Sequence, residues 1–199
     1  MYQKLTRTGL FLLLLFGLNT GAAADEAKDF VVALTRELET ALMAAREQGL
    51  LENQQHLDDL IDQHILPYVD RETLCKKVFR PRWEEIVAQG KADDAYDAVF
   101  ASLKRTYRLA LAAYNGQQIE VGDSIDKGRY SIVRTRVHTR ENGHNIDLAL
   151  HRLEDGWRIF DVSVDGVVVT RTLNGSIQRV LQADDIDAVI DAINPPPAS

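Results

Sequence analysis

Histidine and acidic side chains are the groups in this 199-residue chain that could bind a metal ion or act as a general base. Two histidines four residues apart on a helix form a common zinc site, but no two of the five histidines have this spacing and the sequence contains no HExxH motif. The histidines occupy positions His56, His64, His138, His144 and His151. We therefore predict no metal site.

The acidic segment that begins at Asp161 partly matches a calcium-binding loop. Asp161, Ser163 and Asp165 occupy alternate positions and are followed by Gly166. The twelfth position of such a loop requires a bidentate Glu, but this chain has Thr172 there. The polar residues also alternate with valines, which is typical of a β-strand. We therefore expect a strand here and no calcium site.

Common motifs for nucleophilic catalysis and nucleotide binding (GxSxG, GxxxxGKS/T and GxGxxG) are absent from the sequence. Cys75 is the only cysteine, so no internal disulfide can form, and we expect it to be a small buried hydrophobic residue. No residue is therefore assigned a catalytic role. We predict that the chain is not an enzyme and has no cofactor.

The charge of the chain argues against nucleic-acid binding. Its formal net charge is −7, whereas a nucleic-acid-binding protein needs a cationic surface for the phosphates. Two basic clusters stand out against this acidic background: Lys76, Lys77, Arg80 and Arg82, and Lys104, Arg105 and Arg108. They have two interpretations, a solvated surface or a local contact for an anionic headgroup or an acidic partner.

The N-terminus predicts a secretory signal peptide over residues 1–24. Lys4 and Arg7 precede an apolar run from Leu10 to Leu18, and small residues follow before the expected cleavage point at Ala24. The apolar run is too short to span a bilayer. Cleavage removes two cations and lowers the formal net charge from −7 to −9. We therefore expect an exported, soluble protein.

The remaining chain is predicted to form one domain over residues 25–194, followed by a proline-rich tail at 195–199. Apolar residues recur at three- and four-residue intervals in its first half, and this pattern predicts helices at 30–45, 57–65, 83–87 and 96–114. The last of these has the strongest amphipathic pattern, and Asn115-Gly116 is a typical helix end.

From residue 119 the apolar period changes to two, which predicts strands at 119–121, 130–139, 146–150, 157–164 and 167–170. The turns between them are expected at Asn142-Gly143, Asp155-Gly156 and Asp165-Gly166. Helical spacing returns at 173–181 and 186–193. The sequence therefore predicts an α+β fold in which helices cover one side of an antiparallel sheet.

Five segments, in this order, carry a resemblance to a known family: Ile65–Asp70, Val78–Trp83, Phe100–Tyr114, Trp157–Val169 and Leu181–Ile193. With the signal peptide in front, they resemble the MlaC family, the periplasmic phospholipid-binding proteins of the Mla system. The chain departs from the family pattern at three places. Phe79-Arg80 replaces Leu-Gly, Val168 replaces Ser, and residues 172–177 lack the usual Tyr and Phe.

The resemblance implies an NTF2-like fold with an apolar pocket between a curved antiparallel sheet and several helices. It implies a phospholipid ligand, with the acyl chains in the pocket and the headgroup at its mouth. It further implies a periplasmic carrier that shuttles phospholipid between an outer-membrane lipoprotein complex and the MCE-domain subunit of an inner-membrane ABC transporter, which maintains outer-membrane lipid asymmetry. We expect this carrier to be a monomer.

Apolar positions of the strongest helix and of the strands are the candidates for the lipid-binding wall of this pocket: Phe100, Leu103, Tyr107, Leu111, Val133, Val137, Leu148, Leu150, Phe160, Val162 and Val164. Periodicity alone does not distinguish a hollow core from a filled one, so the same residues could fill a solid core. The resemblance is what favours a pocket.

Two other classes of function remain open at this point. An NTF2-like hydrolase or isomerase would use the same pocket with Asp161 or a histidine as base, and a pocket carboxylate with a strongly raised pKa would favour it. A protein-only adaptor would have no cavity and a large exposed apolar patch.

Overall fold

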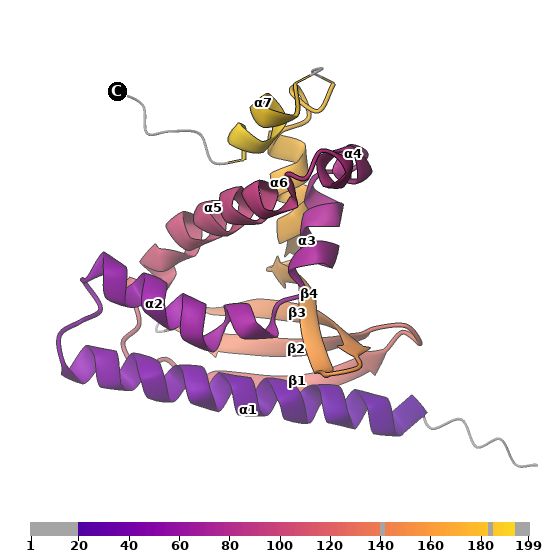
Figure 1. Cartoon of the computed structure of the whole chain (residues 1–199). Coiled ribbons are helices and arrows are strands. Elements are labelled where there is room, and N and C mark those ends of the chain that lie inside the picture. The colour runs from indigo at the N-terminus through magenta and orange to yellow at the C-terminus, as the bar shows by residue number, and fades with distance from the viewer. Residues whose placement is uncertain (1–19, 140–141, 183–184, 194–199) are drawn as a thin grey trace, which may run out of the picture.

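The computed structural model of the chain describes residues 20–139, 142–182 and 185–193 (Figure 1). Residues 1–19 of the predicted signal peptide and the tail at 195–199 lie outside the described residues. Within the described part of the chain, no helix combines the length and apolar character needed to cross a membrane.

The first half of the chain is helical, as predicted. Its helices are α1 (Thr20–Glu47), α2 (Gln54–His64), the short 3-10 helix η1 (Leu66–Tyr68), α3 (Arg71–Val78), α4 (Trp83–Ala88) and α5 (Ala92–Ala112). A five-stranded sheet follows, formed by β1 (Ile119–Asp126), β2 (Ser131–His138), β3 (Gly143–Leu153), β4 (Gly156–Val164) and β5 (Val167–Val168). The chain ends with α6 (Val169–Ser176) and α7 (Ile186–Asp191).

The sheet is an antiparallel meander in which neighbours in sequence are neighbours in space, in the order β1-β2-β3-β4-β5. The predicted α+β class is therefore confirmed. The last strand is shorter than the predicted 167–170, because α6 begins at Val169 and turns the chain away from the sheet after two paired residues.

The helices fall into two groups around the sheet (Figure 1). The long helix α1 runs along one side of the sheet, and α2 lies between α1 and α5. The helices α3, α4, α6 and α7 gather with the N-terminal half of α5 beyond the β4 end of the sheet, and we call these the upper helices. The sheet and the upper helices form the two sides of a wedge.

Three separate apolar clusters stabilise this arrangement. The first lies within the upper helices and is centred on Phe79, Trp83 and Val99. In the second, α1 packs on the sheet through residues that include Val31 and Val133. The third joins α1, α2 and the C-terminal end of α5. Because the described part of the chain packs into three apolar clusters rather than one, the space between them does not have to be filled to keep the fold.

A β-bulge interrupts the alternation of β4. Ala149 pairs with Asp161 and Leu150 pairs with Ile159, so Phe160 is an extra residue on β4 with no counterpart on β3. The predicted alternation in which Phe160, Val162 and Val164 share one face is therefore wrong at Phe160. The bulge shifts the side chains before it by one position relative to those after it.

The segment between α2 and α3 is tied to β4. The backbone N–H of Asp70 donates to the carbonyl of Ile159 at 2.9 Å, and Val69 forms an isolated parallel bridge with Ile159. Asp70 also caps α3, because its carboxylate accepts from the backbone N–H of Thr73 at 3.0 Å and from the Thr73 hydroxyl at 2.5 Å. His151 Nε2 lies 2.7 Å from the same carboxylate.

We expect Asp70→Ala to lower the free energy of unfolding by about 1–2 kcal/mol at pH 7, because α3 loses its cap. Burial alone would raise the pKa of Asp70, but the hydrogen bonds from Thr73 and the nearby His151 outweigh it and lower the pKa. The contribution is therefore present above the unfolded value of 3.8 and is lost as the pH falls through the folded value below it. Urea denaturation of both proteins at several pH values measures this.

The difference between wild type and Asp70→Ala should shrink on acidification below pH 3.8. Asp123→Ala on the exposed side of β1 is the control and should have little effect at any of these pH values. A stability difference for Asp70→Ala that stays constant over the acid range contradicts the assigned role.

Candidate functional site

An apolar cavity of about 240 Å³ lies in the wedge between α2 and η1, α5, and the β3–β4 part of the sheet. Its lining residues are Ile61, Ile65, Leu66, Val69, Leu74, Phe100, Leu103, Lys104, Tyr107, Leu111, Ile146, Ile159, Asp161, Val162, Val164 and Val169. Only Lys104 and Asp161 among them carry a charge. The cavity lies where the three apolar clusters meet, so the region is hollow rather than solid.

The cavity-facing side of α5 agrees with the sequence. Phe100, Leu103, Tyr107 and Leu111 recur at helical spacing and all line the cavity. Burial raises the pKa of the Tyr107 hydroxyl, so this side chain stays neutral in the apolar surroundings. From the sheet, the candidates Val162 and Val164 also line the cavity.

The remaining candidates from β2 and β3 lie elsewhere. Val133 and Leu150 are buried in the cluster beneath α1, and Leu148 packs against the same cluster. Val137 lies farther along β2, opposite Ile119 and His144 in the neighbouring strands. Sequence alternation identified the correct face of these strands, but α1 covers this part of the face and the cavity begins only toward β4.

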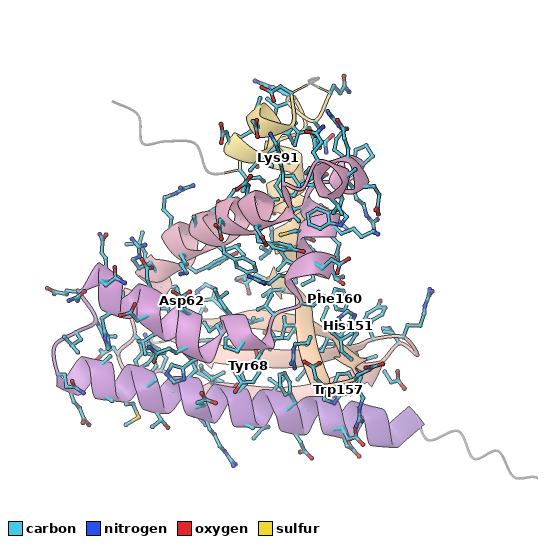
Figure 2. The ribbon with its side chains drawn as sticks, in the orientation of Figure 1. Asp62, Tyr68, Lys91, His151, Trp157 and Phe160 are labelled. Carbon is cyan, nitrogen blue, oxygen red and sulfur yellow. The ribbon has the colours of Figure 1, made fainter. Side chains whose placement is uncertain are left out.

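Phe160 lies on the other side of the sheet because of the bulge. Its ring packs 5.8 Å from Tyr130 and 5.0 Å from His151, and the ammonium of Lys77 lies 5.0 Å from its centroid. Figure 2 shows Phe160 and His151 next to each other, and Trp157 lies near the start of the same strand, β4. The structure therefore does not place Phe160 in the cavity wall.

The wall formed by α2 and η1 was not among the predicted site residues. Ile61, Ile65, Leu66 and Val69 supply this side of the cavity. The first two belong to the apolar pattern that predicted the helix at 57–65, so the signal was present, but nothing in the pattern showed that this helix faces α5. Ile159 enters the wall because the bulge brings it to the same face as Val162.

An outer groove of about 730 Å³ adjoins the cavity. It shares Leu66, Val69, Phe100 and Lys104 with the cavity lining, and we call these four residues the neck. The groove is otherwise rich in charge, with Asp62, Arg71, Asp97, Asp155 and Arg158 among its lining residues. An apolar chamber that continues into a charged groove fits a molecule with an apolar part and a charged part.

Asp161 is the buried carboxylate in the cavity wall, and its contacts define its role. Its Oδ1 accepts from the backbone N–H of Val162 at 3.0 Å and of Thr170 at 3.3 Å. Its Oδ2 accepts from the Thr170 hydroxyl at 2.7 Å and pairs with the Lys77 ammonium. A general base needs an oxygen directed at its substrate, and here both oxygens are occupied. Asp161 therefore fastens β4 to α3 and α6.

Neither the cysteine nor any histidine of the described part of the chain belongs to the cavity lining. Burial raises the pKa of the Cys75 thiol to about 12, so Cys75 stays protonated and is a poor nucleophile. His64, His138 and His144 each pair with one carboxylate outside the cavity lining. Among the described residues, no group of three histidine, cysteine or acidic side chains is placed to hold a metal ion.

A family model described as MlaC protein matches residues 36–195 of this chain. The chain belongs to the MlaC family. The matched span contains the cavity lining and the outer groove, so the hollow region belongs to the part of the chain that defines the family. The resemblance seen in the sequence motifs is thereby confirmed.

A solved structure shares the fold of this MlaC-family chain. It is a phospholipid-binding protein from Ralstonia solanacearum in complex with a phospholipid. The two chains superpose with a TM-score of 0.75 at 18% sequence identity, over 84% of this chain and 93% of the other. This likeness supports the same arrangement of helices and antiparallel sheet.

We expect Asp161→Asn to destabilise this MlaC-family protein by about 1–3 kcal/mol, because Lys77 loses its counter-charge and one buried hydrogen bond is lost or strained. Asp155→Asn is the matched control, since Asp155 pairs with Arg158 at an exposed site and should cost less than about 1 kcal/mol. Guanidinium denaturation of the three proteins measures both effects. Equal stability of the two variants contradicts a fastening role for Asp161.

Proposed function

We propose that this MlaC-family protein is a periplasmic phospholipid carrier that moves lipid between outer- and inner-membrane complexes and so maintains outer-membrane lipid asymmetry. The observation that carries the proposal is the apolar cavity joined to a charged groove through the neck. The apolar lining of the cavity suits acyl chains, and the charged lining of the groove suits a headgroup. The phospholipid held by the Ralstonia solanacearum protein of the same fold supports the choice of ligand.

The free energies involved are compatible with a carrier. Removing acyl chains from water gains about 0.8 kcal/mol per methylene, so two chains of roughly 15 methylenes gain on the order of 20 kcal/mol. A bilayer offers nearly the same gain, so transfer between membrane and protein is close to balanced. Small free-energy differences at each docking partner are then sufficient to set the direction.

The proposed partners are an outer-membrane lipoprotein complex and the MCE-domain subunit of an inner-membrane ABC transporter, with the carrier acting as a monomer. Membership of the MlaC family supports these partners and the periplasmic location. The predicted signal peptide at residues 1–24 supports export. The NTF2-like hydrolase or isomerase loses its main candidate base, because the contacts of Asp161 occupy both carboxylate oxygens.

Lipid analysis of the purified protein tests the proposal directly. Native mass spectrometry and solvent extraction should show phospholipid bound to protein purified from a bacterial host. The protein should also take up labelled phospholipid from vesicles. Protein that is free of lipid after purification and also fails to take lipid from vesicles would contradict the proposal.

We expect Leu103→Asp to reduce bound phospholipid by at least about tenfold, because it places a charge in the apolar cavity wall. Leu109→Asp is the matched control on the same helix, since Leu109 is 76% exposed and should leave lipid binding unchanged. Lipid-to-protein ratio by mass spectrometry gives the readout, with circular dichroism to show that both variants are folded. Equal lipid content in the two folded variants contradicts the assigned cavity.

A further inference from the structure

Two ion pairs join α2 to α5 at the edge of the cavity. Lys104 Nζ lies 2.5 Å from Asp62 Oδ1. One helical turn away on each helix, Arg108 forms a two-bond pair with Asp58, with Nε 3.0 Å from Oδ1 and Nη2 2.8 Å from Oδ2. Figure 2 shows Asp62 on the side of α2 that faces α5. We call these two pairs the α2–α5 seam.

The seam lies beside the apolar wall. Ile61 and Ile65 on α2 and Leu103 and Tyr107 on α5 line the cavity, and each is within a few residues of a seam charge in its helix. Lys104 belongs to both the cavity lining and the outer groove, so the Lys104–Asp62 pair lies at the neck. A ligand that passes from the groove into the cavity therefore passes this pair.

The volume of the cavity limits the size of the ligand that it can enclose. Its volume of about 240 Å³ lies below the roughly 300–1,000 Å³ of pockets that enclose drug-sized ligands. A phospholipid with two acyl chains is larger than such ligands. The cavity must therefore widen before both chains lie inside it, and the α2–α5 seam is one wall that partly exposed ion pairs hold together.

We propose that the α2–α5 seam is the gate for acyl chains, and that its two ion pairs keep the gate closed between transfers. The inference rests on the proposed lipid carriage. Partly exposed ion pairs are weak and reversible, which suits a contact that opens in every cycle. The Arg108–Asp58 side chains are each 23% exposed, whereas Asp62 at the neck is 47% exposed. The pair at the neck is therefore the more easily broken of the two, and opening begins there.

The test measures the rate of lipid transfer rather than the amount of lipid bound. The probe is a phospholipid carrying a self-quenching fluorophore on one acyl chain, in phosphatidylcholine vesicles whose zwitterionic surface limits effects of salt on the membrane. The double variant Asp58→Asn/Asp62→Asn removes both anionic partners without touching the cavity lining. We expect it to take up and release the probe about three- to tenfold faster than wild type.

Two controls separate the gate from general effects of charge. Asp187→Asn breaks a comparable pair with Lys91, away from the cavity, and should transfer lipid at the wild-type rate. The charge exchange Asp58→Arg/Arg108→Asp, made in otherwise wild-type protein, restores attraction across the seam and should also return the wild-type rate. Raising the salt concentration should speed transfer by wild type but not by the double variant.

The outcomes distinguish the gate from the carrier function itself. Wild-type protein that takes up no probe contradicts lipid carriage. Wild-type protein that takes up the probe, with a folded double variant of equal rate and equal salt dependence, overturns the gate and leaves carriage intact. If the double variant does not fold, the single variant Asp62→Asn opens the neck pair alone, and an unchanged rate for it overturns the gate as well.

Discussion

The ion pair between the buried carboxylate of Asp161 and Lys77 holds the sheet and the upper helices in the arrangement that leaves a cavity between them. A buried carboxylate is tolerated only when it is fully paired, and here the Thr170 hydroxyl and the backbone N–H groups of Thr170 and Val162 supply the remaining bonds. These contacts join β4 to both α3 and α6. The backbone bond from Asp70 to Ile159 fastens the same strand to the start of α3. The wedge is therefore set by polar contacts at its apex.

The three apolar clusters explain how the protein can stay folded around a hollow. Each cluster packs densely on its own: the upper helices, the contact of α1 with the sheet, and the junction of α1, α2 and α5. The cavity lies between them, and the packing of each cluster does not depend on side chains that fill the cavity. A protein with one continuous core would close this space, because core side chains pack to high density. Division of the core is thus what makes a hollow region compatible with folding.

Most of the architecture could be predicted from periodicity, whereas only part of the site could. The helix at 96–114 and the meander of strands followed from spacing, and so did the cavity-facing row from Phe100 to Leu111 on α5. Spacing could not show that α1 covers Val133 and Leu150, because alternation gives the buried face of a strand but not the element that covers it. Nor could it show the bulge, since Phe160 is as apolar as Val162 and Val164 and the irregularity exists only in pairing with β3.

The cavity between the apolar clusters also links ligand occupancy to the lifetime of the protein. Side chains around the cavity, such as Leu74 and Ile159, lack packing partners on one side, and a bound apolar chain would supply the missing dispersion contacts. Any ligand that binds only the folded state stabilises it by mass action. A carrier with a bound ligand would therefore unfold less often than an empty one and would expose fewer cleavage sites to proteases. Proteolysis would then remove carriers without a bound ligand faster than carriers with one.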